Sequence, residues 1–171
     1  MMILPDNFDP AERGARARDN FLAGYNCCQA VLLAFSDVLQ ANRLAGEPLL
    51  KIIGSGFGGG FARMREVCGS FTACTMLAGF ISPADSTDLE VRKTNYSLVQ
   101  EMAMDFRAAN GSIVCREMLE MKERQAEGPT PSARTAEYYS KRPCPEIVRN
   151  AAVIAANKMK EAARYDMNPE S

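Results

Sequence analysis

Four of the six cysteines lie where the local sequence predicts the start of a helix: Cys27, Cys68, Cys115 and Cys144. A helix N-terminus presents unpaired N–H groups and about half a positive charge. This setting favours the thiolate, which is the form of cysteine that attacks disulfides and binds metals. Because the four residues are spread over most of the chain, we expect the fold to bring their sulfur atoms together at one site.

The other two cysteines, Cys28 and Cys74, have different surroundings. Cys28 directly follows Cys27, and successive helical residues point about 100° apart, so the two side chains cannot face one site equally. Cys28 could serve as a spare or resolving thiol, or it could be a core residue. Cys74 lies in the most apolar segment of the chain. We expect it in the core, where cysteine behaves as a small hydrophobic residue.

Cys68 has the neighbours that best favour an attacking thiolate. Gly69 follows it directly, and Arg63 and Arg65 shortly precede it. A nearby guanidinium stabilises a thiolate through its charge. The two arginines could instead be solvated surface charges. We take Cys68 as the expected attacking sulfur and expect it to be alkylated more readily than Cys74 near neutral pH.

A glycine-rich run, GSGFGGG, covers residues 54–60. It lacks the Lys-Ser or Lys-Thr pair of a phosphate-binding P-loop, and no strand is predicted before it, as a dinucleotide-binding motif would require. We expect these glycines to permit positive φ and a close approach of the backbone to a cofactor or a helix. The candidates for cofactor contact are Gly58, Gly59, Gly60 and Gly69.

The composition excludes several kinds of chemistry. The chain of 171 residues contains no histidine, so it has neither a Cys–His or Ser–His nucleophile pair nor a Cys₂His₂ zinc site. A net charge of −1, with both signs interspersed, gives no indication of nucleic-acid binding. The 47% hydrophobic content can supply a core, and we expect one domain over residues 1–171.

Two absences bear on the cellular location. The opening residues, MMILPDNF, lack the basic region and apolar run of a signal peptide. No apolar stretch reaches the ~18 residues of a membrane span. We therefore expect a cytoplasmic protein without a membrane span. Clustered cysteines in that compartment usually serve redox chemistry or bind metal, because persistent structural disulfides are unusual there.

Helical periodicity and capping residues predict an all-α fold, and no persuasive strand pattern is present. Asp9-Pro10 and Asn26 are good helix starts, and Asn110-Gly111 is a good helix end. We expect a single-domain bundle of about six helices, with spans or starts at residues 9–23, 26–38, 71–81, 86–109, 112 and 144, and a short helix at 48–53.

Two segments stand out from this pattern. Residues 71–81 are almost wholly apolar but short for a membrane helix, so we expect them to form the central buried helix of the bundle. Residues 122–142 are rich in charge, Gly, Pro and Ser, and we expect a long surface loop there. A loop of about twenty residues is unusual in a compact domain and is typical of a mobile or functional segment.

Several segments follow one another in a specific order: GYNCCQAVLLAF (24–35), FGGG (57–60), CGSFTA (68–73), GSIVCREML (111–119) and Cys144. Together they resemble the redox-active protein family defined by four cysteines and a CGAxxG motif (C_GCAxxG_C_C). The resemblance extends over about residues 12–160 and is specific as an ordered set.

The resemblance places the family's four cysteines on the same residues that the helix starts indicate, namely Cys27, Cys68, Cys115 and Cys144. It also shows two departures. Ser70 stands where the motif has alanine, and Ala73 stands where it has its final glycine. What the resemblance implies is redox activity, and it adds little about mechanism.

Three functions are compatible with the sequence. In the first, the protein is a thiol–disulfide oxidoreductase without a cofactor, in which one thiolate attacks a disulfide and a second cysteine resolves the mixed disulfide. In the second, it is an electron-transfer module whose four cysteines bind an iron–sulfur cluster, because four cysteines are the usual ligands. In the third, it is a helical scaffold with structural thiols. The redox partner is unidentified, and no nucleic-acid partner is expected.

Overall fold

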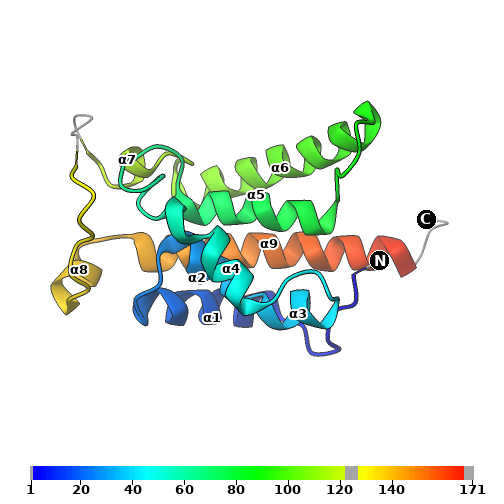
Figure 1. The fold of residues 1–171 in the computed structure, drawn as a ribbon, viewed down its shortest axis with the longest axis horizontal. Coiled ribbons are helices and arrows are strands. Elements are labelled where there is room, and N and C mark those ends of the chain that lie inside the picture. Colours follow the sequence, from blue (N-terminus) through cyan, green and yellow to red (C-terminus); the bar gives the residue numbers. More distant parts are fainter. Residues whose placement is uncertain (1, 122–126, 168–171) are drawn as a thin grey trace.

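The computed structural model describes residues 2–121 and 127–167, with side chains described up to residue 164. Within these residues the chain forms nine α-helices and no strand, so the predicted all-α fold is confirmed (Figure 1). A short 3₁₀ turn, η1, covers Ser55–Phe57. The α-helices are α1 (Pro10–Leu22), α2 (Cys27–Leu33), α3 (Ser36–Ala41), α4 (Glu47–Ile53), α5 (Gly69–Ile81), α6 (Leu89–Asn110), α7 (Cys115–Met118), α8 (Ala136–Ser140) and α9 (Cys144–Met167).

The helix ends follow the local sequence. The Asp9 carboxylate caps α1, and Asn26 forms a capping box with Gln29 at the start of α2. Asp88 caps α6, and Gly111 ends that helix with a φ of 86°. These side chains satisfy N–H groups that have no partner within the helix. The starts and stops predicted at these residues are confirmed.

The nine α-helices of the described chain exceed the six expected helices and the expected short helix at 48–53 for two local reasons. The predicted helix at 26–38 is interrupted at Phe35, where φ is −115° and ψ is 7°, so the described chain has α2 and α3 there instead of one helix. The predicted loop at 122–142 contains the short helix α8. Of that loop, residues 122–126 lie outside the described residues.

The longer helices pack in pairs that join distant parts of the sequence. Helix α1 packs against α2 and α9, and α5 packs against α2, α6 and α9. Helix α9 also contacts α2 and α6. The apolar helix α5 thus shares the interior with α9, and its place as the one central helix stays a prediction. Among the described residues, no helix combines the length and hydrophobicity needed to cross a membrane.

One end of the molecule collects several helix starts. In Figure 1, α5 and α9 both begin at the end where α7 and α8 lie. The N-terminal ends of helices carry partial positive charge and free N–H groups. The fold therefore concentrates at this end the kind of environment that stabilises anions.

Candidate functional site

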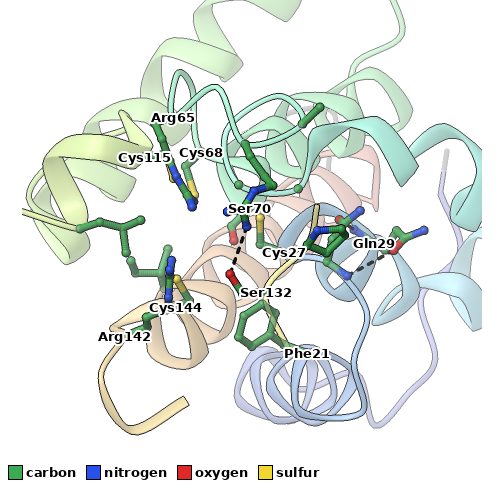
Figure 2. Close-up of a pocket in the computed structure, with 18 of the residues that line it drawn as sticks. Phe21, Cys27, Gln29, Arg65, Cys68, Ser70, Cys115, Ser132, Arg142 and Cys144 are labelled. Atoms are coloured by element: carbon green, nitrogen blue, oxygen red, sulfur yellow. Dashed lines mark hydrogen bonds between the residues drawn. The ribbon is translucent and has the colours of Figure 1, made fainter. Parts of the chain in front are cut away.

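Four cysteines from four helices line one cavity of about 460 Å³ (Figure 2). Cys27, Cys115 and Cys144 are the first residues of α2, α7 and α9. Cys68 immediately precedes α5 as its N-cap. The predicted placement of these cysteines at helix starts is confirmed, although α7 begins at Cys115 and not at the expected residue 112. The structure also brings all four side chains to the same cavity.

Backbone hydrogen bonds hold two of these helix starts side by side. The segments before α5 and α7 form an isolated antiparallel bridge. The Cys68 N–H donates to the Ile113 carbonyl at 2.8 Å, and the Cys115 N–H donates to the Glu66 carbonyl at 2.7 Å. The spacing between these two cysteines is therefore set by main-chain contacts and does not depend on the state of the sulfur atoms.

Cys27 is the thiol with the most acidic character. The Cys68 thiol donates a hydrogen bond to the Cys27 sulfur, and this bond is the main cause of a Cys27 pKa lowered to about 6. Burial opposes the shift, while the backbone N–H groups of Gly59, Cys28 and Gly69 add to it by donating to the same sulfur. Hydrogen bonds to the charged form favour that form. These contacts therefore favour the thiolate form at Cys27.

Cys68 has the opposite shift. Its pKa is raised well above the ordinary value, first because its proton is held in the hydrogen bond to Cys27 and then because the side chain is buried next to that negative charge. Two sulfur atoms in contact do not both ionise easily. The directions of the two pKa shifts favour Cys27 over Cys68 as the thiolate, whereas the sequence favours Cys68, and the attacking role of either residue stays a prediction.

The two arginines before Cys68 serve other partners. Arg65 is only 4% exposed, so the surface-charge alternative is wrong for it. Its guanidinium forms an ion pair with Glu127 and lies 3.9 Å from the sulfur of Cys115. Arg63 also pairs with Glu127, at 2.6 Å. Neither guanidinium has a hydrogen bond to Cys68 within the described residues, which is why the expected stabilisation of that thiolate is missing.

Cys115 and Cys144 are neutral thiols near neutral pH. Burial raises the pKa of Cys115, although Arg65 and Arg142 oppose the shift. Burial raises the pKa of Cys144 to about 11, and the negative charge of Cys27, together with that of Cys115 once it ionises at higher pH, adds to the effect. A helix start alone therefore does not produce a thiolate at these two positions, because desolvation outweighs it.

Glycines allow the chain to approach the sulfur atoms closely. A Cβ at Gly69 would lie 2.4 Å from the carbonyl oxygen of Phe57 and 2.6 Å from the sulfur of Cys27. A Cβ at Gly60 would lie 2.7 Å from the Cβ atom of Cys115, and Gly60 has a φ of 69°. These glycines therefore allow the backbone to lie close to two cysteine side chains, and their contact with a cofactor stays a prediction.

The loop that carries the other glycines is conformationally strained. All residues of 59–63 have φ values in the left-handed region, between 47° and 71°. Such values cost non-glycine residues roughly 1–2 kcal/mol each, and strain of this kind is concentrated at functional sites. Gly58 and Gly59 line the cavity. The strained loop places the Gly59 N–H on the Cys27 sulfur.

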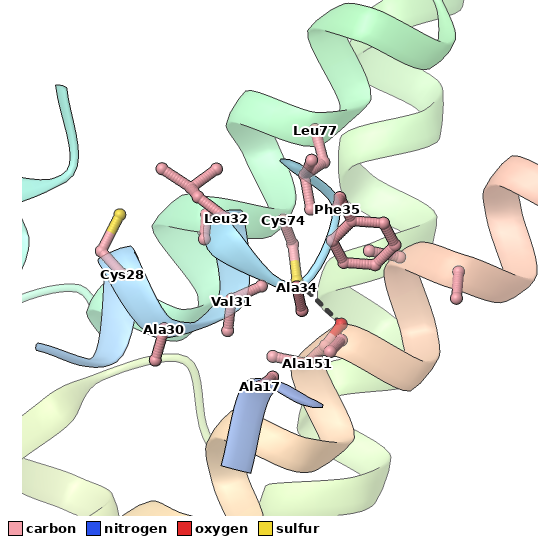
Figure 3. Packing of buried hydrophobic residues seen from close by; sticks show 14 of the residues in the cluster. Ala17, Cys28, Ala30, Val31, Leu32, Ala34, Phe35, Cys74, Leu77 and Ala151 are labelled. Atoms are coloured by element: carbon pink, nitrogen blue, oxygen red, sulfur yellow. Dashed lines mark hydrogen bonds between the residues drawn. The ribbon is translucent and has the colours of Figure 1, made fainter. Parts of the chain in front are cut away.

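The remaining two cysteines belong to the hydrophobic core (Figure 3). Cys28 and Cys74 are both 0% exposed. Burial raises the pKa of Cys74 to about 12 and that of Cys28 well above its ordinary value. The Cys74 thiol donates to the carbonyl oxygen of Ala151 at 3.4 Å. The core position expected of Cys74 is confirmed. Of the roles left open for Cys28, the structure supports that of a core residue.

Sequence reasoning missed several residues of the cavity. Ser70, Arg134 and Arg142 all line it. The only signal for Ser70 was its departure from the motif alanine. The two arginines lie in a charge-rich segment with no local motif, so their position could be found only from the tertiary structure.

The arrangement of the cavity cysteines bears on whether they could bind a metal. In the described part of the chain, no group of three or more His, Cys, Asp or Glu side chains is arranged to hold a metal ion. The contact between Cys27 and Cys68 is a hydrogen-bonded pair, while Cys115 has Arg65 as its neighbour. The cavity contains a dithiol pair with two further thiols on its wall.

The comparison with protein families gives a clear result. The sequence profile of a family described as "Putative redox-active protein (C_GCAxxG_C_C)" matches residues 25–158, which is more than half of the chain. The chain belongs to this family. The resemblance seen in its cysteine segments is thereby confirmed. Neither a curated protein nor a solved structure matches the chain.

Proposed function

We propose that this member of the C_GCAxxG_C_C family catalyses thiol–disulfide exchange, with Cys27 as the nucleophile and Cys68 as the resolving thiol. The observation that carries the proposal is that Cys27 and Cys68 line the same cavity, where the contact with the Cys68 thiol is the first cause of the lowered Cys27 pKa. This one contact stabilises the attacking thiolate and keeps a second sulfur next to it. Cys27 is also only partly buried and lines the cavity, so a substrate can reach it.

The first step forms a mixed disulfide. The Cys27 thiolate attacks one sulfur of a substrate disulfide, a new S–S bond forms, the substrate S–S bond breaks, and one substrate thiolate leaves. A thiolate with a pKa near ambient pH is well suited to this attack. The N–H groups of Gly59 and Gly69 hold the Cys27 sulfur in place before the reaction.

The second step releases the product. Once the Cys27 sulfur is bonded to substrate, it carries no negative charge, so the main cause of the raised Cys68 pKa is removed. Cys68 then loses its proton to the departed substrate thiolate and attacks the Cys27 sulfur. The mixed disulfide breaks, a second substrate thiolate leaves, and a Cys27–Cys68 disulfide forms. The substrate gains two electrons, and a dithiol reductant must return two electrons to the protein.

The other two thiols are not needed for this exchange. Cys115 and Cys144 are neutral at neutral pH because burial raises their pKa values. We propose that they are auxiliary thiols on the cavity wall. The proposal includes the cytoplasmic location expected from the sequence, since a dithiol enzyme of this kind needs a reducing compartment.

The test is chemical trapping followed by peptide mass spectrometry. Reduced protein treated with a small neutral disulfide should lose two thiols and gain a Cys27–Cys68 cross-link. The Cys68→Ala variant should stop at a mixed disulfide on Cys27. Cys144→Ala is the matched control and should form the same cross-link as the unaltered chain. Adducts on Cys115 or Cys144, with Cys27 left reduced, would overturn the proposal.

An iron–sulfur cluster is the second candidate. The observation in its favour is that four cysteines from separate helices line one cavity, and four cysteines are the usual ligands of such clusters. Protein purified without oxygen should be analysed for visible absorbance and iron. Stoichiometric iron bound through all four cysteines would favour the cluster, whereas colourless protein with six titratable thiols would favour the dithiol enzyme.

A further inference from the structure

We infer that the cavity accepts a small disulfide that carries carboxylate or other anionic groups. The inference rests on the proposed function, because it names the substrate class of the Cys27–Cys68 pair. It is carried by three features of the cavity wall: its charge, two arginines held without acidic partners, and a buried hydroxyl without a hydrogen-bond partner.

The cavity wall has a one-sided charge. Among its described lining residues are four arginines, and none is Asp or Glu. Two of the arginines, Arg63 and Arg65, share the single carboxylate of Glu127. The one negative charge of Glu127 therefore balances only one of these two guanidinium charges. A cavity lined by one sign of charge attracts ligands of the opposite sign.

The other two arginines are held by aromatic rings. The Arg134 guanidinium lies 4.7 Å from the ring centre of Phe21 and 4.8 Å from that of Tyr138. The Arg142 guanidinium lies 4.7 Å from the Tyr138 ring. Stacking on a ring face fixes a guanidinium without using its N–H donors. Among the described residues, neither arginine forms an ion pair or donates a hydrogen bond, so both can bind a carboxylate.

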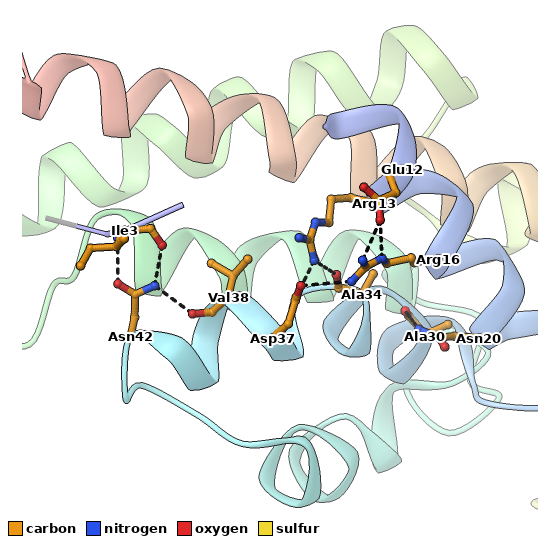
Figure 4. A network of polar contacts seen from close by, with 10 residues as sticks. All are labelled: Ile3, Glu12, Arg13, Arg16, Asn20, Ala30, Ala34, Asp37, Val38 and Asn42. Carbon is orange, nitrogen blue, oxygen red and sulfur yellow. Dashed lines mark hydrogen bonds and ion pairs between the residues drawn. The ribbon is translucent and has the colours of Figure 1, made fainter. Parts of the chain in front are cut away.

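Arginines elsewhere in the molecule show the contrast. Arg13 and Arg16 both form ion pairs with the Asp37 carboxylate (Figure 4). Arg16 also pairs with Glu12. These guanidiniums are occupied by the protein itself and tie α1 to α3. Within the described residues the two ring-stacked arginines at the cavity form no ion pair of this kind, so their N–H groups are available to a ligand.

The buried hydroxyl is that of Ser70. This residue is 0% exposed, and its Oγ has no hydrogen-bond partner in the described structure. It lines the cavity close to the thiols, two residues after Cys68 (Figure 2). A buried hydroxyl without a partner is costly, and such groups are rare in folded proteins. A polar atom of the bound substrate would satisfy it.

The size of the cavity favours a small molecule over a protein disulfide. Its volume of about 460 Å³ is within the range of ligand pockets. Cys27 is partly buried, and Cys68 is 5% exposed. A disulfide on the surface of a folded protein would have to enter the cavity to meet these sulfur atoms, whereas a small disulfide can do so freely.

The experiment compares three small disulfides that differ in charge: 3,3′-dithiodipropionate (anionic), bis(2-hydroxyethyl) disulfide (neutral) and cystamine (cationic). The rate at which each modifies Cys27 in the reduced protein is divided by its rate with a free thiol in solution. We expect the anionic probe to be favoured over the neutral one about tenfold, and over the cationic one by more.

Substitutions of single residues show which side chains cause the preference for the anionic disulfide. Arg142→Gln and Arg134→Gln should each reduce the preference for the anionic probe about threefold to fivefold, while Arg142→Lys and Arg134→Lys should retain most of it. Arg92→Gln, which changes an exposed arginine on α6 away from the cavity, is the matched control and should have no effect. In Ser70→Ala, the concentration of the anionic probe that gives the half-maximal rate should rise about threefold to tenfold, as expected for one lost hydrogen bond.

The possible failures are distinguishable. If Cys27 reacts with none of the probes, the proposed exchange function itself is overturned. If Cys27 reacts with all three at equal normalised rates, the exchange function stands and the anionic substrate class is overturned. The same conclusion follows if the disulfides of intact insulin react faster than any small probe, because the substrate would then be a protein.

Discussion

Cys27 and Cys28 are neighbours in the sequence and in the same helical turn, yet the structure gives them opposite chemistry. The pKa of Cys27 is lowered to about 6, whereas the pKa of Cys28 is raised well above its ordinary value. Cys27 lines the cavity and accepts hydrogen bonds from a thiol and three backbone N–H groups. Cys28 is fully buried among apolar side chains. Hydrogen-bond donors at the sulfur, and not the helix start alone, decide which thiol ionises.

The same contrast recurs along α5. Cys68 caps the helix and its thiol bonds to Cys27, while Cys74 lies six residues further on in the core and bonds to a backbone carbonyl. Both have raised pKa values, but for different reasons. That of Cys68 comes first from its hydrogen bond to Cys27 and then from burial, and the part due to Cys27 is relieved when Cys27 reacts. That of Cys74 comes from burial and is permanent.

Replacing the cavity cysteine, Cys27, or the core cysteine, Cys28, should give the largest difference in exchange rate between two variants. Cys27→Ser should reduce the rate of exchange with small disulfides at least about 100-fold, because a serine hydroxyl is not ionised near neutral pH. Cys28→Ala should leave that rate within about twofold and lower the free energy of unfolding by about 1 kcal/mol, the cost of a small buried cavity. Exchange kinetics and urea denaturation measure the two effects. A large loss of exchange in Cys28→Ala, with unchanged stability, would break the contrast.

A smaller effect is expected from two glycines of α5. Gly69→Ala would place a Cβ against the Cys27 sulfur and the carbonyl of Phe57, so it should displace Cys27 from its donors and lower the free energy of unfolding by about 1–3 kcal/mol. Gly79→Ala is the matched control, because a Cβ there meets nothing within 4 Å. It should raise the free energy of unfolding by roughly 0.5–1 kcal/mol. Equal stability of the two variants would show that the close approach at Gly69 is unimportant.

Much of this architecture could be predicted from the sequence because it depends on local rules. Capping residues such as Asp9, Asn26 and Asp88 identify helix starts through bonds to N–H groups two or three residues away. Of the helices that begin at the cavity cysteines, α2 follows this rule, whereas α5 and α7 start without a side-chain hydrogen bond from the capping residue. The break at Phe35, by contrast, has no local signal of this kind.

The pairing of side chains across the site could not be predicted, because it depends on tertiary contacts. Arg65 is close to Cys68 in the sequence, but the main-chain bridge before α7 brings Cys115 within its reach. Cys27 owes its low pKa to donors more than 30 residues away in the sequence, such as Cys68. Cation–ring contacts of Arg134 and Arg142 likewise join residues that no short motif connects.

The central claim, that Cys27 is the thiolate and Cys68 its donor, is tested most directly by the pH dependence of alkylation. Reduced protein is treated with iodoacetamide between pH 4 and 10, and each cysteine is followed by peptide mass spectrometry. We expect Cys27 to be labelled first, with a rate that rises through a midpoint of about pH 6, because the thiolate predominates above its lowered pKa.

The matched variants for this measurement are Cys68→Ala, which removes the donor, and Cys68→Ser, which keeps a hydroxyl. The midpoint for Cys27 should move toward the ordinary thiol value of about 8.5 in Cys68→Ala and should move less in Cys68→Ser. A Cys27 midpoint near 8.5 in the unaltered chain, or faster labelling of Cys68 than of Cys27 at pH 6, would contradict the account.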